Sequence, residues 1–275
     1  MLIRLHDFTK IEKGVIMMSD IAHEWQGKGI QNRTDTEEIL EEKVEKQSEM
    51  MKRQYKLLLQ QAEKLRESNI RIIEILGTVV ECRNLESGEH IKRVKGFTKI
   101  LAESLMREYP EYKLTPQCVE IISATSALHD IGKISISDSI LLKPGKLTDE
   151  EYEYMKSHTT RGCEILENIK DVWDEKFHET GYKICRYHHE RYDGSGYPDG
   201  LAGDDIPIEA QIVSVADVYD ALISERVYKE AYAPEEAYRM IITGECGVFS
   251  PKLLECFKKV KKEFEHFHEN VVWNK

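Results

Sequence analysis

The spacing of apolar residues predicts one long helix in the N-terminal part of the chain. From Thr36 to Val80 there is no proline, the one glycine is Gly77, and Glu, Lys, Gln and Leu dominate, a composition typical of a continuous helix. Apolar side chains recur at every seventh position of this stretch, at Val44, Met51, Leu58, Leu65, Ile72 and Val79. This column has the spacing of the a position of a coiled coil, and it favours a parallel homodimer.

The matching d column of this helix is more polar than the a column. Leu40 and Ile75 stand at its ends, and the positions between them are Gln47, Gln54, Gln61 and Ser68. A seam that is half polar holds two helices together weakly or adjustably. The pattern therefore leaves an alternative open, which is a solvated helix whose apolar stripe packs on its own domain.

Shorter helical segments with distinct start and stop signals follow the long helix. One amphipathic face runs from Leu85 to Tyr109 and stops before Pro110. N-cap signals begin three more helices, at Thr115-Pro116, at Thr148 with Glu151, and at Ser250-Pro251. No segment alternates like a sheet for long. We therefore predict an all-α fold class, a helical bundle preceded by the long coiled-coil-like helix, with long loops at 134–146 and 192–207.

Length and patterning divide the chain into four predicted segments. At 275 residues it is long enough for one domain with its own core plus an extension. Residues 1–35 have no sustained period and stay unassigned, and 36–80 form the long helix. Residues 81–268 form the domain, and 269–275 form a tail.

Composition excludes several classes of protein. The formal net charge of −11 disfavours a protein that binds a nucleic-acid polymer, because such proteins need a basic face. The six cysteines stand far apart without a Cys-x-x-Cys pair, so reduced thiols are expected rather than a zinc ribbon or a disulfide framework. No apolar stretch approaches the roughly 20 residues that span a bilayer, and no signal peptide is recognisable, so we expect a cytoplasmic protein.

Histidines and carboxylates within the predicted helices suggest a metal site. Neighbouring residues on a helix point about 100° apart, so His129 and Asp130 can reach one pocket where they flank a pair of ions. We expect this pair at the C-terminal end of the helix that begins at Pro116. Glu86 and His90 are four residues apart, so both can aim at the same ion.

Other donors are weaker signals singly than together. His188 and His189 form a doublet before a glycine-rich run, and Asp217 interrupts an apolar run in which a charge needs a partner or a metal. His158 alone is more typical of a hydrogen-bonded or surface histidine. That interpretation is kept for the histidines outside the site, His6, His23, His178, His266 and His268. Donors without a thiolate suit iron or manganese better than structural zinc, and these are too many for one ion.

Four strings stand out along the chain: His129-Asp130-x-Gly-Lys133, Leu142-Lys-Pro-Gly-Lys-Leu147, His188-His-Glu-Arg-x-Asp-Gly-Ser-Gly-Tyr-Pro198 and Asp217-Val-Tyr-Asp-Ala-Leu222. Together with His158 they resemble the HD-GYP subgroup of the HD phosphohydrolase superfamily, over about residues 79–257. The resemblance implies an all-helical domain, two or three ions of iron or manganese, and hydrolysis of cyclic di-GMP. The implied metal ligands are Glu86, His90, His129, Asp130, His158, His188, His189 and Asp217. Glu86 matches the additional carboxylate of members with three ions.

The resemblance also implies which residues meet the substrate. Lys133, Arg226 and Lys229 would contact phosphate and supply the local positive charge that the acidic chain otherwise lacks. The other implied contacts are Gly196, Tyr197, Pro198 and Asp220. His129 and Asp130 are the implied catalytic residues, together with Lys133.

Three positions depart from the family pattern. Gln211 replaces the usual arginine, which affects either a support of the helix that carries Asp217 or a guanine contact. Val227 replaces a proline. Ser250 replaces an aspartate before Pro251, and a serine should still cap the helix.

The expected activity is a metal-dependent phosphodiesterase that opens cyclic di-GMP to linear pGpG, with GMP open as a further product. Metal ions lower the pKa of bound water from about 15.7 to about 7, so a metal-bridging hydroxide is the expected nucleophile. The alternatives are a hydrolase of another cyclic dinucleotide or nucleotide phosphate, and a non-catalytic module that binds the messenger or a partner protein. The long helix resembles the connector after a receiver domain. No receiver precedes it in this sequence, so we expect a regulatory protein partner or constitutive output.

Overall fold

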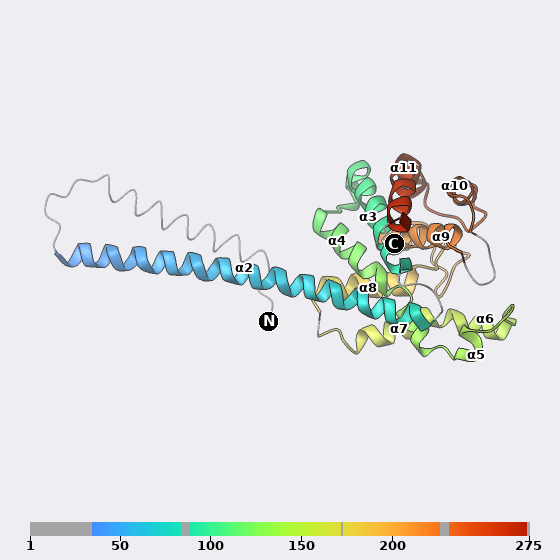
Figure 1. Ribbon diagram of the computed structural model, residues 1–275, viewed down its shortest axis with the longest axis horizontal. Coiled ribbons are helices and arrows are strands. Elements are labelled where there is room, and N and C mark those ends of the chain that lie inside the picture. The colour runs from blue at the N-terminus through green and yellow to red at the C-terminus, as the bar shows by residue number, and fades with distance from the viewer. Residues whose placement is uncertain (1–34, 84–88, 172, 226–230, 274–275) are drawn as a thin grey trace. The chain divides into compact units, whose positions relative to one another are not determined.

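The structure, a computed structural model, describes residues 35–83, 89–171, 173–225 and 231–273. Its regular elements within these ranges are helices, and the one strand-like pairing there is an isolated bridge between Asp193 and Ala202 (Figure 1). The predicted all-α fold class is therefore confirmed. None of the helices in the described ranges is long and apolar enough to cross a membrane. By its internal contacts the chain divides into two units, residues 1–68 and 69–275.

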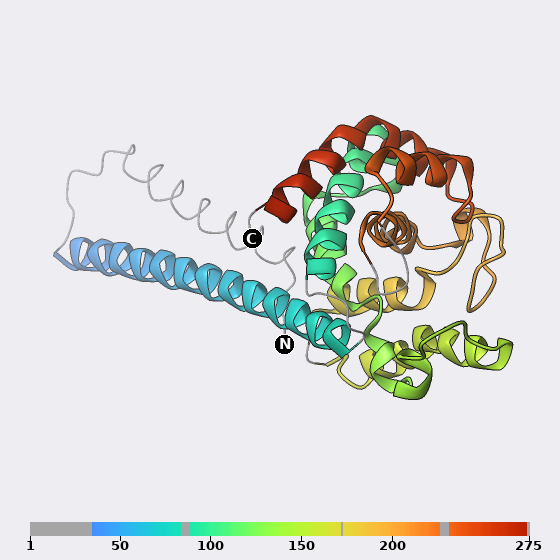
Figure 2. The same cartoon turned by 45° about the vertical axis from the view of Figure 1, so that its right-hand side comes forward.

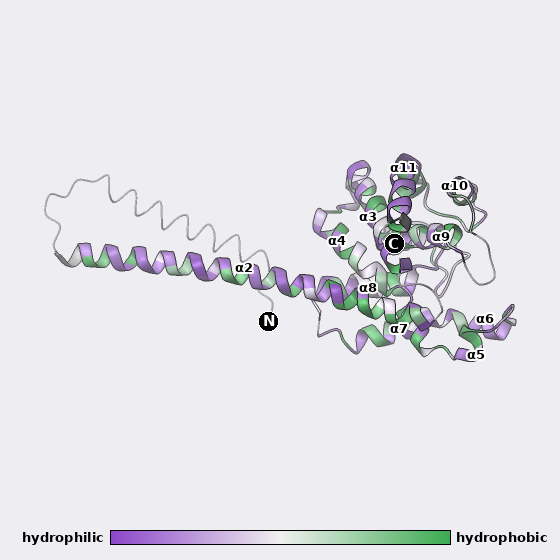
Figure 3. Ribbon diagram, in the orientation of Figure 1, coloured by the Kyte–Doolittle hydropathy of each residue, from purple (hydrophilic) through white to green (hydrophobic). Residues whose placement is uncertain are grey.

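Helix α2 (Asp35–Arg83) is the long helix that the sequence predicted at 36–80. Apolar bands recur along it in Figure 3. The side chains of the a column are all exposed, from 46% at Met51 to 60% at Leu65. Ile72 and Val79 belong to the second unit and are 46% and 58% exposed, so these two side chains do not pack into the core of that unit. A homodimer through this column stays a prediction.

The main core of the second unit forms around a central helix, α9 (Ile208–Ile223). Helices α3, α8 and α10 pack against it (Figure 2). Helix α11 packs along α3. The bounds of these neighbours are Glu89–Glu108 for α3, Glu175–Tyr187 for α8, Pro234–Thr243 for α10 and Pro251–Trp273 for α11. The apolar face that the sequence predicted for α3 is buried at Ile91, Val94, Phe97, Leu101 and Leu105.

A second apolar cluster lies on the other side of α8. It joins the end of α2 to α4 (Pro116–Thr125) and α7 (His158–Glu167). Adjacent residues of α8 serve the two cores, since Ile184 lies in the main core and Cys185 in the second cluster. The short helices α5 (Asp138–Leu141) and α6 (Asp149–Lys156) connect the turn after α4 to α7.

The N-cap signals were informative, with one exception. Thr115 accepts a hydrogen bond from the backbone N–H of Cys118, and Thr148 forms the predicted capping box with Glu151. Helix α11 begins at Pro251 as predicted. The serine cap was wrong, because the Ser250 hydroxyl is buried and has no hydrogen-bond partner in the described part of the chain.

The segment that carries His129 and Asp130 also differs from its prediction. Helix α4 ends at Thr125, and a 3-10 turn, Ser126–Leu128, follows it. The pair therefore lies between two 3-10 turns and not at the end of an α-helix, because a second turn begins at Ile131. The predicted loop at 134–146 contains α5, and α11 continues beyond residue 268. The division of the sequence into domains stays a prediction.

Candidate metal centre

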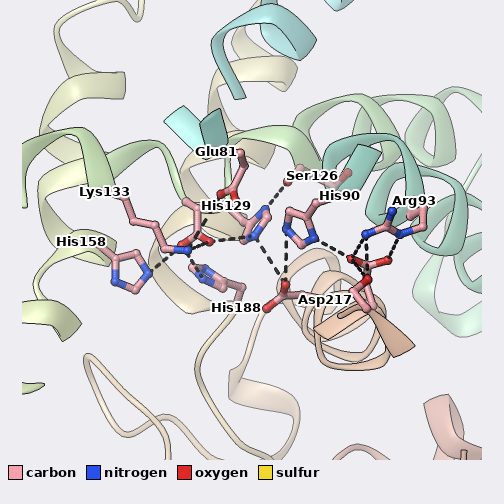
Figure 4. Close-up of polar contacts among 12 residues, drawn as sticks. Glu81, His90, Arg93, Ser126, His129, Lys133, His158, His188 and Asp217 are labelled. Carbon is pink, nitrogen blue, oxygen red and sulfur yellow. Dashed lines mark hydrogen bonds and ion pairs between the residues drawn. The ribbon is translucent and has the colours of Figure 1, made fainter. Parts of the chain in front are cut away.

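Donor residues from well-separated parts of the sequence converge at one place in the second unit (Figure 4). Helix α3 supplies His90, α9 supplies Asp217, and α7 begins with His158. The remaining donors follow the end of α8 or lie between the two 3-10 turns. These donors form two groups. The four-donor group is Asp130, His158, His188 and His189, and the three-donor group is His90, His129 and Asp217. Within each group, one ligand atom of every residue lies within 4.8 Å of those of the other members.

Asp130 lies between the two groups. Its Oδ1 is 3.2 Å from His158 Nε2 and 3.8 Å from His188 Nε2, whereas its Oδ2 is 3.2 Å from His129 Nε2. In the three-donor group, Asp217 Oδ1 is 3.7 Å from His129 Nε2 and 3.8 Å from His90 Nε2. A carboxylate whose two oxygens face different sets of donors has the geometry of a bridging ligand between two ions.

The backbone fixes three of the imidazole rings through Nδ1. His129 Nδ1 lies 2.8 Å from the carbonyl oxygen of Ser126, and His158 Nδ1 lies 2.8 Å from that of Met155. His188 Nδ1 lies 3.0 Å from the Ile184 carbonyl. A carbonyl oxygen only accepts, so Nδ1 carries the proton in each neutral ring and Nε2 offers its lone pair to the centre.

These Nε2 atoms supply a test of whether metal ions fit. The Nε2 atoms of His129, His158 and His188 are buried, as is Asp130 Oδ1, and none has a hydrogen-bond partner among the described residues. Buried polar atoms are nearly always paired, because an unpaired one loses its hydration without compensation. Several such atoms at one point, each of which can donate a lone pair once any bound proton is displaced, fit transition-metal ions.

The fourth ring, His90, is held by a carboxylate that the sequence had placed among the substrate contacts. His90 Nδ1 lies 2.7 Å from Asp220 Oδ2, and Arg93 Nε lies 2.5 Å from Asp220 Oδ1. Asp220 is 1% exposed, so it is closed off from the cleft. Asp220 lies behind His90 and orients it, in the way that carboxylates support metal-bound histidines, and its predicted contact with substrate stays a prediction.

The two groups differ in their electrostatics. Burial would lower the pKa of His129, but the negative charges of Asp130 and Asp217 raise it to about 10. Burial and the positive charge of His129 lower the pKa of His188 to about 3. The three-donor group therefore holds a proton that a cation must displace, whereas His188 in the four-donor group is already neutral.

Lys133 closes one side of the centre. Its Nζ lies 2.5 Å from Asp130 Oδ2 and 3.9 Å from Oε1 of Glu81, a carboxylate that is 1% exposed (Figure 4). Burial raises the pKa of Asp130, but Lys133 and His129 outweigh burial and hold that pKa well below its usual value. Asp130 therefore remains ionised, the state in which a carboxylate binds a cation.

A cleft of about 670 Å³ opens beside the four-donor group. Gly196, Tyr197 and Lys133 are among the residues that line it, and Tyr197 stacks on His189 with ring centroids 4.6 Å apart. Their contact with substrate stays a prediction. Gly196 is required by close packing, because a Cβ there would lie 2.4 Å from the backbone N of Arg191. The other lining residues are Leu141, Tyr152, Met155, Lys156, His158, His189, Arg191 and Ser195.

Comparison with known proteins agrees with this geometry. The family model described as "HD domain" matches residues 88–247, more than half of the chain. The chain belongs to the HD domain family. The resemblance predicted from its motifs is thereby confirmed.

Curated relatives of this HD domain are named for cyclic dinucleotides. A cyclic di-GMP phosphodiesterase of Vibrio cholerae is 42% identical over 69% of this chain and 39% of its own length. A 3'3'-cGAMP-specific phosphodiesterase of the same organism is 38% identical over 73% of this chain and 36% of its own length. The chain thus spans less than half the length of each.

One solved structure shares the fold. A cyclic GMP-AMP specific phosphodiesterase from V. cholerae aligns with a TM-score of 0.52 over 74% of this chain and 53% of its own, at 18% identity. At that identity the likeness concerns the HD-domain fold alone.

Some predicted residues of the HD domain cannot be placed. Glu86, Arg226 and Lys229 lie outside the described residues, and so does Val227. Gln211 is 6% exposed and donates from Nε2 to the Ile206 carbonyl at 2.8 Å, and both of its predicted roles stay open.

Sequence reasoning missed how the ligands and the loop are held in place. It did not name Arg93, which binds Asp220, and it did not predict that Asp220 contacts His90. Glu190 is 3% exposed, and its carboxylate accepts the backbone N–H groups of Asp199, Gly200 and Leu201, which fastens the glycine-rich loop. A charged residue beside the histidine doublet was the one available signal for Glu190, and it does not tell a buried carboxylate from a solvated one.

Proposed function

We propose that this chain is a metal-dependent phosphodiesterase that hydrolyses a cyclic dinucleotide. The observation that carries the proposal is the convergence of buried Nε2 and carboxylate oxygen atoms in two adjoining groups. An unpaired buried polar atom costs about 1–3 kcal/mol, so several at one point are best explained by cations that use them. Relatives named as phosphodiesterases of cyclic dinucleotides support the same activity.

The donor sets suggest two ions with Asp130 shared between them. The four-donor group would hold one ion and the three-donor group the other. Imidazole and carboxylate donors without a thiolate suit iron or manganese. A third ion is a further proposal that depends on Glu86.

The chemistry divides between the ions and the chain. When bound, such ions supply an activated water and neutralise charge on the phosphodiester oxygens. His158 and His188 keep fixed orientations because carbonyl oxygens hold Nδ1 of each ring. Lys133 faces the cleft beside Asp130, where its ammonium group can donate to a phosphoryl oxygen whose charge grows in the transition state.

The cleft suits a ligand with two phosphates and two bases. Its volume of about 670 Å³ lies within the range of about 300–1,000 Å³ typical of small-molecule sites. Lys133, Lys156 and Arg191 supply three cations, which suit phosphate. Tyr152 and Tyr197 supply aromatic rings on which bases can stack.

Cyclic di-GMP is the substrate that we propose first, with linear pGpG as the product and GMP as the product of a second cleavage. The relative named for cyclic di-GMP supports this choice. A 3'3'-cyclic GMP-AMP is the second candidate, because a relative of nearly equal identity is named for it. The cations in the cleft recognise phosphate and do not separate the two.

The test is anaerobic purification and elemental analysis, followed by separate incubation with cyclic di-GMP, 3'3'-cGAMP and cyclic di-AMP. Chromatography identifies the products. We expect about two iron or manganese ions per chain, as a two-metal centre requires, and conversion of cyclic di-GMP to pGpG before GMP accumulates.

The matched control is Asp130→Asn, which keeps the size of the side chain and removes the charge shared by the two groups. It should lose bound metal and turnover together. Undiminished turnover in this variant would exclude the proposed centre. A loaded wild-type protein that turns over none of the three nucleotides would favour a module that binds without hydrolysis.

A further inference from the structure

The last turns of α2 contact the chain on both sides of His129 and Asp130. We call residues 77–83 the α2 end, and all of them lie in the second unit. We infer that the α2 end is a positioning part of the centre: it fixes Asp130 and Lys133, and it passes displacements of the helix to them. Three separate contacts carry this inference.

The first contact lies before the His129-Asp130 pair, at Gly77. A Cβ built at Gly77 would lie 2.4 Å from the carbonyl oxygen of Ala127, far inside van der Waals contact. The helix backbone therefore touches the 3-10 turn that leads into His129, with no room for a side chain between them. Ile73 and Val80, on either side of Gly77, are buried in the same apolar cluster as Ala127.

The second contact lies after the pair, at Arg83. Arg83 Nη1 donates to the carbonyl oxygens of Lys133 at 2.9 Å and Ile134 at 2.8 Å, and Nη2 donates to that of Ile136 at 2.7 Å. Nε and Nη2 also reach Asp138 Oδ1, at 3.1 and 2.7 Å. One planar guanidinium thus ties down the whole turn that follows Asp130, which the single point charge of a lysine cannot do.

The third contact reaches Lys133 itself. Glu81 is 1% exposed, and its Oε1 lies 3.9 Å from Lys133 Nζ. The same ammonium group lies 2.5 Å from Asp130 Oδ2. Two carboxylates on different segments thus share one cation, so a displacement of Glu81 changes the position of Lys133 relative to Asp130.

The three contacts cannot move independently, because they lie on one continuous helix. A helix rises about 1.5 Å per residue, and hydrogen bonds of the observed lengths weaken over a few tenths of an ångström. An axial shift of the α2 end by one residue would therefore break the bonds of Arg83. The effect on turnover rests on the proposed function, whereas the positioning itself does not.

The experiment compares Arg83→Gln with Arg239→Gln in the metal-free full chain by hydrogen–deuterium exchange. Arg239, on α10, is a matched control, because it donates several hydrogen bonds to Glu236 and Glu245. The reporters are two amides of the turn, Lys133, which donates to the Asp130 carbonyl, and Ile136, which donates to the Lys133 carbonyl. Their exchange should quicken by about tenfold in Arg83→Gln and stay unchanged in Arg239→Gln.

Turnover of cyclic di-GMP by the metal-loaded variants is the second readout. Arg83→Gln should lower kcat by about tenfold or more, as variants that disturb supports of a metal site do, with a smaller change in KM. Arg83→Lys should recover only part of kcat and of the amide protection. Arg239→Gln should behave as wild type.

Each outcome bears on the inference. Unchanged exchange at Lys133 and Ile136 in Arg83→Gln would overturn it. Exchange that quickens by the same factor throughout the second unit would also overturn it, because Arg83 would then only stabilise the fold in general. Full recovery by Arg83→Lys would overturn the claim that the guanidinium fork is needed. If the wild type turns over no cyclic dinucleotide, the proposed function fails, while the exchange result still decides the inference.

Discussion

The candidate metal centre and the exposed column of α2 both reverse the usual distribution of polar and apolar residues. In the centre, His129, His158 and Asp130 are polar and are at most 7% exposed. On α2, Leu58 and Leu65 are apolar and are 56% and 60% exposed. A folded chain ordinarily buries the second kind of residue and exposes the first, so each region points to something beyond the chain's own packing.

The two regions differ in how tightly the fold prepares them. In the centre, each of four rings has one nitrogen held by a carbonyl or a carboxylate, so the ligand geometry is set in advance. On α2 only the heptad spacing is set, and the side chains meet solvent. The fixed orientation of the imidazole rings therefore indicates a site for ions, whereas the heptad spacing of apolar residues on α2 indicates pairing with a second helix.

The largest effect should follow from removing one donor of the centre. His158→Gln should reduce turnover by more than the roughly 10–100-fold typical of variants that disturb only the supports of a metal site. Elemental analysis should show a loss of bound metal as well. His178→Gln is the control, because His178 lies on α8 outside both donor groups. Equal activity of the two variants would remove His158 from the centre.

A smaller effect should follow from removing a support. Asp220→Asn should weaken metal binding by about 10–100-fold, measured by competition with a chelator, because His90 loses its charged partner. Asp171→Asn changes an exposed aspartate and should have no effect. At saturating metal the KM of Asp220→Asn should equal that of wild type. A raised KM would return Asp220 to the substrate contacts.

A charge placed in the α2 column should change the mass of the particle in solution by a factor of two. We propose that it joins two copies in parallel, so Leu58→Asp should halve the mass measured by light scattering, because a charge at an a position opposes helix pairing. Gln60→Asp introduces the same charge outside both apolar columns and should leave the mass unchanged. A mass unaffected by Leu58→Asp would reject the homodimer.

The smallest effect is a shift in melting temperature on metal binding, which should depend on the centre and not on the column. Manganese at about a hundredfold excess over its Kd should stabilise the protein by about 2.7 kcal/mol, and so raise its melting temperature by about 5–10 °C. Leu58→Asp should show the same rise, because the column does not belong to the centre. Asp130→Asn should show a much smaller one. Loss of the rise in Leu58→Asp would mean that the two regions are coupled.

Predictions of helix caps and helix bounds were confirmed where residues close in the sequence determine the local structure. The capping box of Thr148 and Glu151 is such a case, because the four residues from Thr148 to Glu151 suffice to form it. The bounds of α2 followed from composition and spacing. The prediction for Ser250 failed, because burial of its hydroxyl depends on the packing around it and not on the next residues.

Motif matching found the candidate donors but not their supports. Asp220 belongs to the motif that begins at Asp217 and was grouped with the substrate contacts, and the sequence contains no sign that α9 turns it toward His90 and Arg93. Glu81 and Arg83 lie at the end of a solvated-looking helix, where charged residues are ordinary. Their partners are about fifty residues away, so no local pattern reveals them.

By itself, the sequence determined the helical class, the long helix with its apolar column, and the residues able to bind metal, because each follows from residue type and short-range spacing. The tertiary structure alone decided that those residues converge, that Asp130 lies between two groups, and that the α2 end clamps the turn around it. The physical reason is that convergence depends on how α3, α7, α8 and α9 pack on one another. Packing over long separations is a property of the whole folded chain.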